Sequence, residues 1–201
     1  GGMIANNSSG ARSVLYGKTI DHVIELEAGM ADGSIARLGA GCAPERGSLH
    51  ATCENTVRWL SAEHAVEIDR RFPKVLRRVG GYNLDEFVPG HAPFNFAKMI
   101  VGSEGTLAVI LEAKLNLVPL PREKAVLVIQ FREVLEALEA TPLILGHRPS
   151  AVEVMDSFIL DHTKLSPNLQ RVRETFVEGE PGAILCVEFY ADRKEDLPPR
   201  L

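Results

Sequence analysis

The stretch GSEGTLAVILEAKLNL, residues 102–117, joins a glycine-rich turn directly to a strand. From Val109 to Leu117, apolar residues at the odd positions alternate with mostly polar residues at the even positions. This period of two predicts a β-strand whose odd-numbered side chains share one face. The preceding turn allows the main chain to approach another group closely, because glycine has no Cβ in the way.

Two further glycine-rich segments lie upstream, at residues 1–17 and 79–84. Backbone amides in such loops can bind phosphate. Neither segment matches GxxxxGK[ST] or a GxGxxG that follows a strand, which excludes a P-loop and a Rossmann fingerprint. By composition alone, residues 1–10 fit either a flexible tail, with Gly1-Gly2 as a cloning remnant, or a binding loop. A phosphate-bearing cofactor remains one of the open interpretations.

The remaining pattern predicts an α+β protein. Before the stiff connector Pro119-Leu-Pro121, we expect a strand at 20–28, a hairpin return at 34–38, a loop at 39–47, a helix at 48–71 and a short helix at 95–100. After it, we expect strands at 125–131, 152–155 and 183–189, and helices at 132–140 and 156–165, the second capped by Asp156. The connector is the predicted domain boundary, which separates residues 1–121 from residues 122–201.

Composition excludes several classes of protein. The formal net charge of −5 and the pI near 5.7 disfavour a nucleic-acid-binding surface. No apolar run is long enough to span a membrane, and residues 1–10 do not form a secretory signal. Three cysteines without CxxC spacing indicate reduced thiols and a cytoplasmic location, and their spacing matches no zinc template.

In order along the chain, the motifs GGMIANNSSGARSVLYG, GGYNL and VGSEGTLAVI resemble the FAD-linked oxidase family. These flavoproteins have a p-cresol methylhydroxylase-type FAD domain and include D-lactate, glycolate and D-2-hydroxyglutarate dehydrogenases. The resemblance implies that residues 1–121 are the C-terminal part of that FAD domain and that residues 122–201 begin the α+β substrate (cap) domain. Ala108 and Leu111 depart from the glycine and the threonine or serine of many members.

The resemblance also assigns FAD-binding roles residue by residue. Gly1 and Gly2 open the first loop, which wraps the pyrophosphate and ribityl chain with Asn7, Ser8, Ser9 and Gly10. Arg12, Tyr16 and Gly17 follow, and the cation of Arg12 can reach a phosphate or the flavin edge. Gly81 and Tyr82 fall near the isoalloxazine face. Gly102, Ser103, Glu104, Gly105, Thr106 and Leu107 pass beside the flavin, and Ile110 contacts the adenine side.

By the same resemblance, the parent protein oxidises a small D-2-hydroxy acid by hydride transfer to flavin N5 and passes electrons to a quinone, cytochrome or iron–sulfur partner. The family's first FAD loop and its catalytic and metal-binding residues would lie outside these 201 residues, so no catalytic residue or metal ligand is assigned. We therefore expect an internal fragment that is inactive alone and binds FAD weakly or not at all. The alternatives are a non-catalytic α/β interaction module and another FAD oxidase or reductase of the same fold.

Other polar and aromatic residues have simpler interpretations. Each of the six histidines is expected to be a surface or core residue. Trp59 and the phenylalanines are expected in the core. The basic cluster at residues 70–78 is expected to be a solvated face, with the steering of an anionic substrate as the alternative.

Overall fold

The computed structural model describes residues 1–200 and divides into two compact units. The N-terminal unit comprises Gly1–Gly10 and Gly17–Val118. The C-terminal unit comprises Ala11–Tyr16 together with the chain from Pro119 onward. The short segment Ala11–Tyr16 therefore groups with a part of the chain that lies more than a hundred residues away in sequence.

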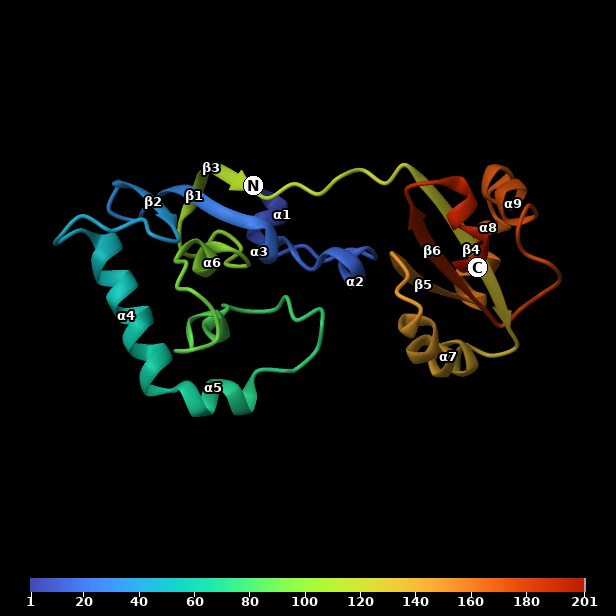
Figure 1. Ribbon diagram of the computed structural model, residues 1–201, viewed down its shortest axis with the longest axis horizontal. Helices are drawn as coiled ribbons and strands as arrows, with labels where there is room; N and C mark the ends of the chain where they lie inside the picture. The colour runs from blue at the N-terminus through green and yellow to red at the C-terminus, as the bar shows by residue number, and fades with distance from the viewer. Residues whose placement is uncertain (201) are drawn as a thin grey trace. The chain divides into compact units, whose positions relative to one another are not determined.

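An antiparallel three-stranded sheet forms the centre of the N-terminal unit (Figure 1). Its strand order is β2 (Ile35–Gly39), β1 (Val23–Gly29) and β3 (Val109–Leu115). The predicted hairpin between β1 and β2 is confirmed, and the Asp32 carboxylate closes its turn by accepting from the Ser34 amide at 2.9 Å. Leu26 and Ala28 on β1 are fully buried and form the middle of the core.

The predicted strand after residue 108 is confirmed, but the predicted facing of its side chains is wrong. Opposite the step from Glu27 to Ala28, the pairing passes from Glu112 to Ile110 and leaves Leu111 as an extra residue. This β-bulge interrupts the alternation. Ile110 and Ala113 consequently pack against the core, whereas Leu111 is exposed.

The helices of the N-terminal unit are mostly short. They are α1 (Gly2–Ala5), α3 (Thr19–His22), α4 (Leu49–Glu63), α5 (Ala65–Arg71), the 3₁₀ turn η1 (Leu84–Phe87) and α6 (Ala97–Ile100). The helix expected at 48–71 begins as predicted, with the Ser48 side chain accepting from the Ala51 amide, but it breaks at His64 into α4 and α5 (Figure 1).

Two expectations about side chains in this unit are wrong. Trp59 is 60% exposed on α4 and is not a core residue. Arg78 does not belong to a solvated basic face, because its guanidinium lies largely buried over the Phe72 ring and donates to Asp85 at 2.6 Å. The sequence shows the cluster of charges but not which member turns inward.

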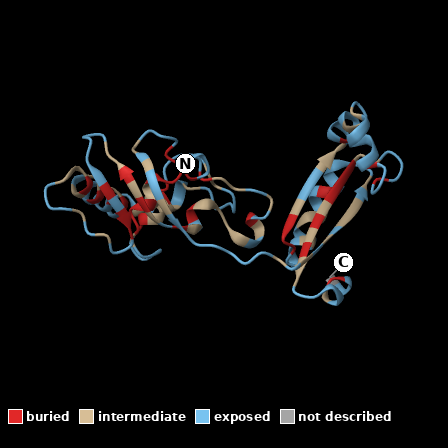
Figure 2. Cartoon of the chain, turned by 90° about the horizontal axis from the view of Figure 1, so that it is seen from above, coloured by how far each residue is buried: buried red, intermediate tan, exposed pale blue. Residues whose placement is uncertain are grey.

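A second antiparallel sheet forms the centre of the C-terminal unit, in the order β4 (Glu123–Phe131), β6 (Ala183–Ala191) and β5 (Ala151–Asp156). The surrounding elements are α2 (Ser13–Tyr16), α7 (Val134–Gly146), α8 (Ser157–Thr163), α9 (Pro167–Arg173), η2 (Lys194–Asp196) and η3 (Pro198–Arg200). The middle strand β6 contributes to an apolar cluster on each face of the sheet, and Figure 2 shows buried residues along it.

The helix ends of this unit follow ordinary capping chemistry. Asp156 caps α8 as predicted, because its carboxylate accepts from the Ile159 amide at 2.9 Å. Helix α9 was not predicted, although Pro167 at its first position is a start signal. Among residues 1–200, every helix is too short or too polar to cross a bilayer.

Candidate functional site

The three glycine-rich segments meet in the N-terminal unit at Gly102. The Gly102 amide donates to the Ile4 carbonyl at 3.0 Å, which joins the third segment to the first. A Cβ on Gly102 would lie 3.3 Å from the Cβ of Asn7, 3.5 Å from Nδ2 of Asn83 and 3.7 Å from the carbonyl oxygen of Gly81. Its φ of +80° also favours glycine. We call this meeting point, formed by residues 4–7, 81–83 and 102–104, the three-loop junction.

Hydrogen bonds fix the junction from each segment. The Glu104 amide donates to the Ala5 carbonyl at 2.9 Å. The side-chain Nδ2 of Asn83 donates to the Val101 carbonyl at 2.6 Å, which ties the second segment to the residue directly before the third. Beside these contacts, the hydroxyl groups of Tyr82 and Thr106 are hydrogen-bonded at 2.8 Å. The three motifs therefore form one connected structure.

Asn7 has an unusual environment at the centre of this junction. Its side chain is fully buried, and its Oδ1 accepts from the Ile20 amide at 3.0 Å. Within the described residues, its Nδ2 has no hydrogen-bond partner. A buried donor without an acceptor is costly. The orphaned amide group therefore marks a place where a bound polar ligand would supply an acceptor.

Several glycines around the junction are not required by the chain's own fold. Gly2, Gly10 and Gly80 have no positive φ, and a Cβ on any of them would meet no atom within 4 Å. Larger residues would therefore fit there without strain. Glycine at these positions leaves bare main chain accessible, which suits a ligand that lies against the backbone.

The structure divides the predicted site residues between the two units. Those in the N-terminal unit are Gly1, Gly2, Asn7, Ser8, Ser9, Gly10, Gly17, Gly81, Tyr82, Gly102, Ser103, Glu104, Gly105, Thr106, Leu107 and Ile110. Arg12 and Tyr16 lie in the C-terminal unit. Asn83, which holds the second loop, was not singled out from the sequence, although its place directly after Gly-Gly-Tyr was an available signal.

Arg12 forms a charged cluster on the C-terminal sheet. Its Nε and Nη2 donate to the two carboxylate oxygens of Glu188 at 3.0 and 3.1 Å. The Tyr190 hydroxyl donates to the same carboxylate at 3.2 Å. The hydrogen bond from Arg12 lowers the pKa of Glu188, while burial raises the pKa of Tyr190. Glu188 was not predicted, and its partner is 176 residues away in sequence.

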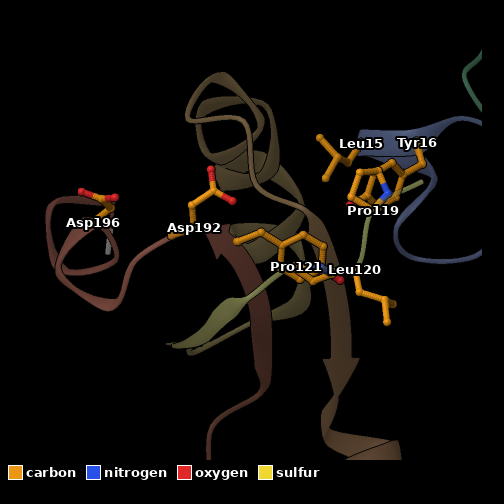
Figure 3. A pocket seen from close by; sticks show the side chains of 9 residues that line it. Leu15, Tyr16, Pro119, Leu120, Pro121, Asp192 and Asp196 are labelled. Atoms are coloured by element: carbon orange, nitrogen blue, oxygen red, sulfur yellow. The ribbon is translucent and has the colours of Figure 1, made fainter.

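A pocket of about 450 Å³ adjoins this cluster within the C-terminal unit (Figure 3). Leu15, Tyr16 and the connector prolines supply apolar side chains, and Asp192 and Asp196 lie on the opposite side. The Asp196 carboxylate is already paired with Arg193 at 2.9 Å. The pocket is therefore an open, mixed surface next to the Arg12–Glu188 pair.

Residues 1–200 hold few other groups that could carry chemistry. The three cysteines are all free thiols. Within this range, no three side chains of His, Cys, Asp or Glu converge in a way that could hold a metal ion. The three-loop junction, with its buried orphan amide group, is the strongest candidate for a ligand site.

Comparison with protein families matches both ends of the chain. The family described as "FAD binding domain" matches residues 1–39, and the family described as "FAD linked oxidases, C-terminal domain" matches residues 120–201. The first match includes the Asn7 loop, and the second begins within the proline connector.

Relatives of assigned function resemble nearly the whole chain. A D-2-hydroxyglutarate dehydrogenase of Haemophilus influenzae is 32% identical over 98% of this chain, which covers 20% of that protein. A D-lactate dehydrogenase of Archaeoglobus fulgidus is 26% identical over 97% of the chain, which covers 33% of that protein. The chain thus spans about a fifth to a third of the length of these relatives.

A solved structure of alkyldihydroxyacetonephosphate synthase resembles the fold. Its TM-score is 0.58 at 18% sequence identity, and the match covers all of this chain and 31% of that one. This likeness supports the arrangement of helices and strands.

Proposed function

Because the chain belongs to the FAD-linked oxidase family, we propose that the three-loop junction binds FAD in a dehydrogenase of small D-2-hydroxy acids. The observation that carries this proposal is the buried Asn7 amide group without a partner, set where three glycine-rich loops meet. The chemistry fits, since a phosphate- and carbonyl-rich cofactor offers acceptors to Asn7 Nδ2 and to exposed backbone amides.

The proposed division of roles follows the loops. The segment from Asn7 to Gly10 would lie along the pyrophosphate and ribityl chain. The turn from Gly102 to Leu107 and the Gly81-Tyr82 pair would lie beside the flavin, with Ile110 toward the adenine. In this arrangement, residues 1–121 contribute to the FAD domain and residues 122–201 to the substrate domain.

FAD, when bound, would supply the redox chemistry by accepting the hydride that the hydroxy acid loses. The contribution of this chain would be to bind the cofactor, orient it and exclude water from it. We further propose a cytoplasmic location, supported by the three free thiols, and a quinone, cytochrome or iron–sulfur protein as electron acceptor.

The test exploits the glycines that the fold itself does not need. In the complete gene product, Gly10→Leu and Gly80→Leu should leave folding intact, because each Cβ enters open space. Each should weaken FAD binding about tenfold or more, because the side chain fills room that the cofactor would occupy. Gly146→Leu is the matched control, since that glycine also has an open surrounding but lies at the end of α7.

Flavin absorbance after gel filtration gives the amount of FAD retained. Turnover of a panel of D-2-hydroxy acids with an artificial electron acceptor gives the substrate class. Equal FAD retention by Gly10→Leu, Gly80→Leu and Gly146→Leu would refute the proposed site, and absence of turnover across the panel would refute the proposed substrate class.

A further inference from the structure

The segment Ala11–Tyr16 links the two units in an unusual way. The chain leaves the N-terminal unit after Gly10, contributes six residues to the C-terminal unit and returns at Gly17. Gly17 has a φ of +82°, a backbone conformation that favours glycine. In the chain, this segment therefore directly follows the loop from Asn7 to Gly10.

The Arg12 side chain provides a polar attachment of this segment to β6. The Arg12 guanidinium meets the Glu188 carboxylate with two parallel hydrogen bonds, the geometry that arginine makes with carboxylates most favourably. Below Arg12, the ring of Tyr190 lies with its centroid 5.8 Å from the guanidinium carbon. The Tyr16 ring lies 6.5 Å from that of Tyr190, centroid to centroid. Arg12 and Tyr16 thus both lie against Tyr190 of β6.

The surroundings of Glu188 favour an ion pair with Arg12. It lies on the middle strand, with Val126 and Ala151 as its neighbours across the sheet, and its side chain is only 13% exposed. A carboxylate in such surroundings needs a charged partner, because a mostly buried, unpaired charge is costly. Tyr190 offers a single hydroxyl, so Arg12 supplies most of the compensation.

The same hydrogen bonds bear on the role assigned to Arg12 by family resemblance. Glu188 occupies the Nε–Nη2 edge of this guanidinium, which is one of the two edges with which an arginine can grip a phosphate. We propose that Arg12 is a positioning residue: together with Glu188 it anchors to the C-terminal sheet the segment Ala11–Tyr16, which directly follows the loop from Asn7 to Gly10 in the chain, and its paired donors serve Glu188 rather than the FAD phosphate. This inference rests on the proposed FAD site.

A double-mutant cycle in the complete gene product separates the two roles. If Arg12 is an anchor, Arg12→Gln and Glu188→Gln each raise the Kd for FAD about tenfold, and the double variant is no weaker than either single variant. If Arg12 binds phosphate, Glu188→Gln leaves FAD binding unchanged or tighter while Arg12→Gln weakens it. That second pattern would overturn the proposal. Asp161→Asn, which breaks an exposed ion pair of the same unit, is the control and should change nothing.

Hydrogen exchange provides a readout that does not need FAD. The amides of Leu15 and Tyr16 donate to the Arg12 carbonyl at 3.1 and 3.0 Å. In the 201-residue chain, Arg12→Gln and Glu188→Gln should each speed exchange of these amides about tenfold, while Asp161→Asn should not. Unchanged exchange would overturn the anchor. Faster exchange in a protein that never binds FAD would keep the anchor and refute the proposed function instead.

Discussion

The two sheets have the same size and pairing but are buried differently. Each has three antiparallel strands, with β1 in the middle of one and β6 in the middle of the other. β6 carries the apolar run AILCVEFYA and packs on both faces, whereas β1 alternates buried with exposed or half-buried residues (Figure 2). A strand covered on both faces reads as a nearly continuous apolar run, and a strand covered on one face alternates. The C-terminal unit is thus organised around a sheet enclosed on both sides, and the N-terminal unit around a one-sided sheet.

The glycines show the same contrast. Of the 17 glycines, only Gly146, Gly179 and Gly182 lie in the C-terminal unit. The N-terminal unit holds the rest, largely in loops whose main chain stays accessible. Binding residues concentrate on loops that a rigid scaffold positions. The N-terminal unit is thus rich in glycine loops, whereas the C-terminal unit is built mainly from packed strands and helices.

The largest expected effect tests whether the two sheets support separate units. Leu26→Ala on β1 and Leu185→Ala on β6 remove matched, fully buried side chains from the two middle strands. Each should lower the free energy of unfolding of its own unit by about 3 kcal/mol, through lost burial and a residual cavity. Trp59, the only tryptophan, reports on the N-terminal unit by fluorescence, and hydrogen exchange of β6 reports on the other.

In that experiment, Leu26→Ala should shift the Trp59 transition, and Leu185→Ala should shift the exchange of β6. Val126→Ala, on an exposed apolar residue of β4, is the control and should change little. If either leucine variant shifted both signals equally, the chain would unfold as one cooperative unit. The different burial of the two sheets would then not correspond to separate free energies of unfolding.

A smaller effect sharpens the description of the three-loop junction. Gly102 and Gly105 have nearly the same φ, +80° and +79°, so alanine costs about 1 kcal/mol in backbone strain at either position. Only at Gly102 would the added Cβ meet Asn7 and Asn83. Gly102→Ala should therefore cost about 2 kcal/mol in all, measured by urea unfolding with Trp59 fluorescence. Equal losses of unfolding free energy in Gly102→Ala and Gly105→Ala would show that the loops do not meet at Gly102.

A third comparison tests the ion pair and the ring contact that Arg58 forms from helix α4. On α4, Glu54 is nearly buried and accepts from Arg58 at 2.8 Å, and the Arg58 guanidinium covers the Phe94 ring. Arg58→Ala should cost about 1 kcal/mol, because Glu54 keeps only His50, at 3.5 Å, and the Phe94 ring loses its cover. Arg70→Ala removes an exposed pair with Glu67 and should cost less than about 0.5 kcal/mol in the same unfolding assay. If Arg70→Ala lowered the free energy of unfolding more than Arg58→Ala, burial of Glu54 would contribute little to stability.

Much of the fold follows from local patterns in the sequence. The β1–β2 hairpin, the Asp156 cap and the strands on either side of the connector each depend on a short run of residues, and all are present. The facing of β3 was mispredicted because one bulge, opposite Glu27 and Ala28, depends on the partner strand. The exposure of Trp59 likewise depends on which side of α4 the sheet covers, and composition does not encode it.

The candidate site divides in the same way. Ordered glycine motifs in the sequence were sufficient to pick the loops that meet at Gly102. They did not identify Asn83, whose side chain donates to the carbonyls of Lys98 and Val101. They also did not identify Glu188, which contacts Arg12 only in the folded chain. Long-range polar pairing is the part of the site that a single sequence conceals.

The smallest expected effect concerns pH and the Arg12–Glu188 anchor. In the folded chain, the hydrogen bond from Arg12 lowers the pKa of Glu188 below its ordinary value of 4.5. A carboxylate with a lowered pKa contributes stability at higher pH and loses it as the pH falls through the folded value. The segment Ala11–Tyr16 should therefore loosen as the pH falls below about 4.5. Tyr190 and Arg12 keep their protons throughout this range, so Glu188 is the titrating member of the cluster.

Chemical shifts of the Tyr16 and Tyr190 rings should follow this titration in the wild-type chain. They should stay flat in Glu188→Gln, in which other carboxylates such as Asp32 and Asp161 still titrate. A titration that persisted in Glu188→Gln would show that another group causes the pH response. The packing of Tyr16 on Tyr190, rather than the charge pair, would then hold the segment on the sheet.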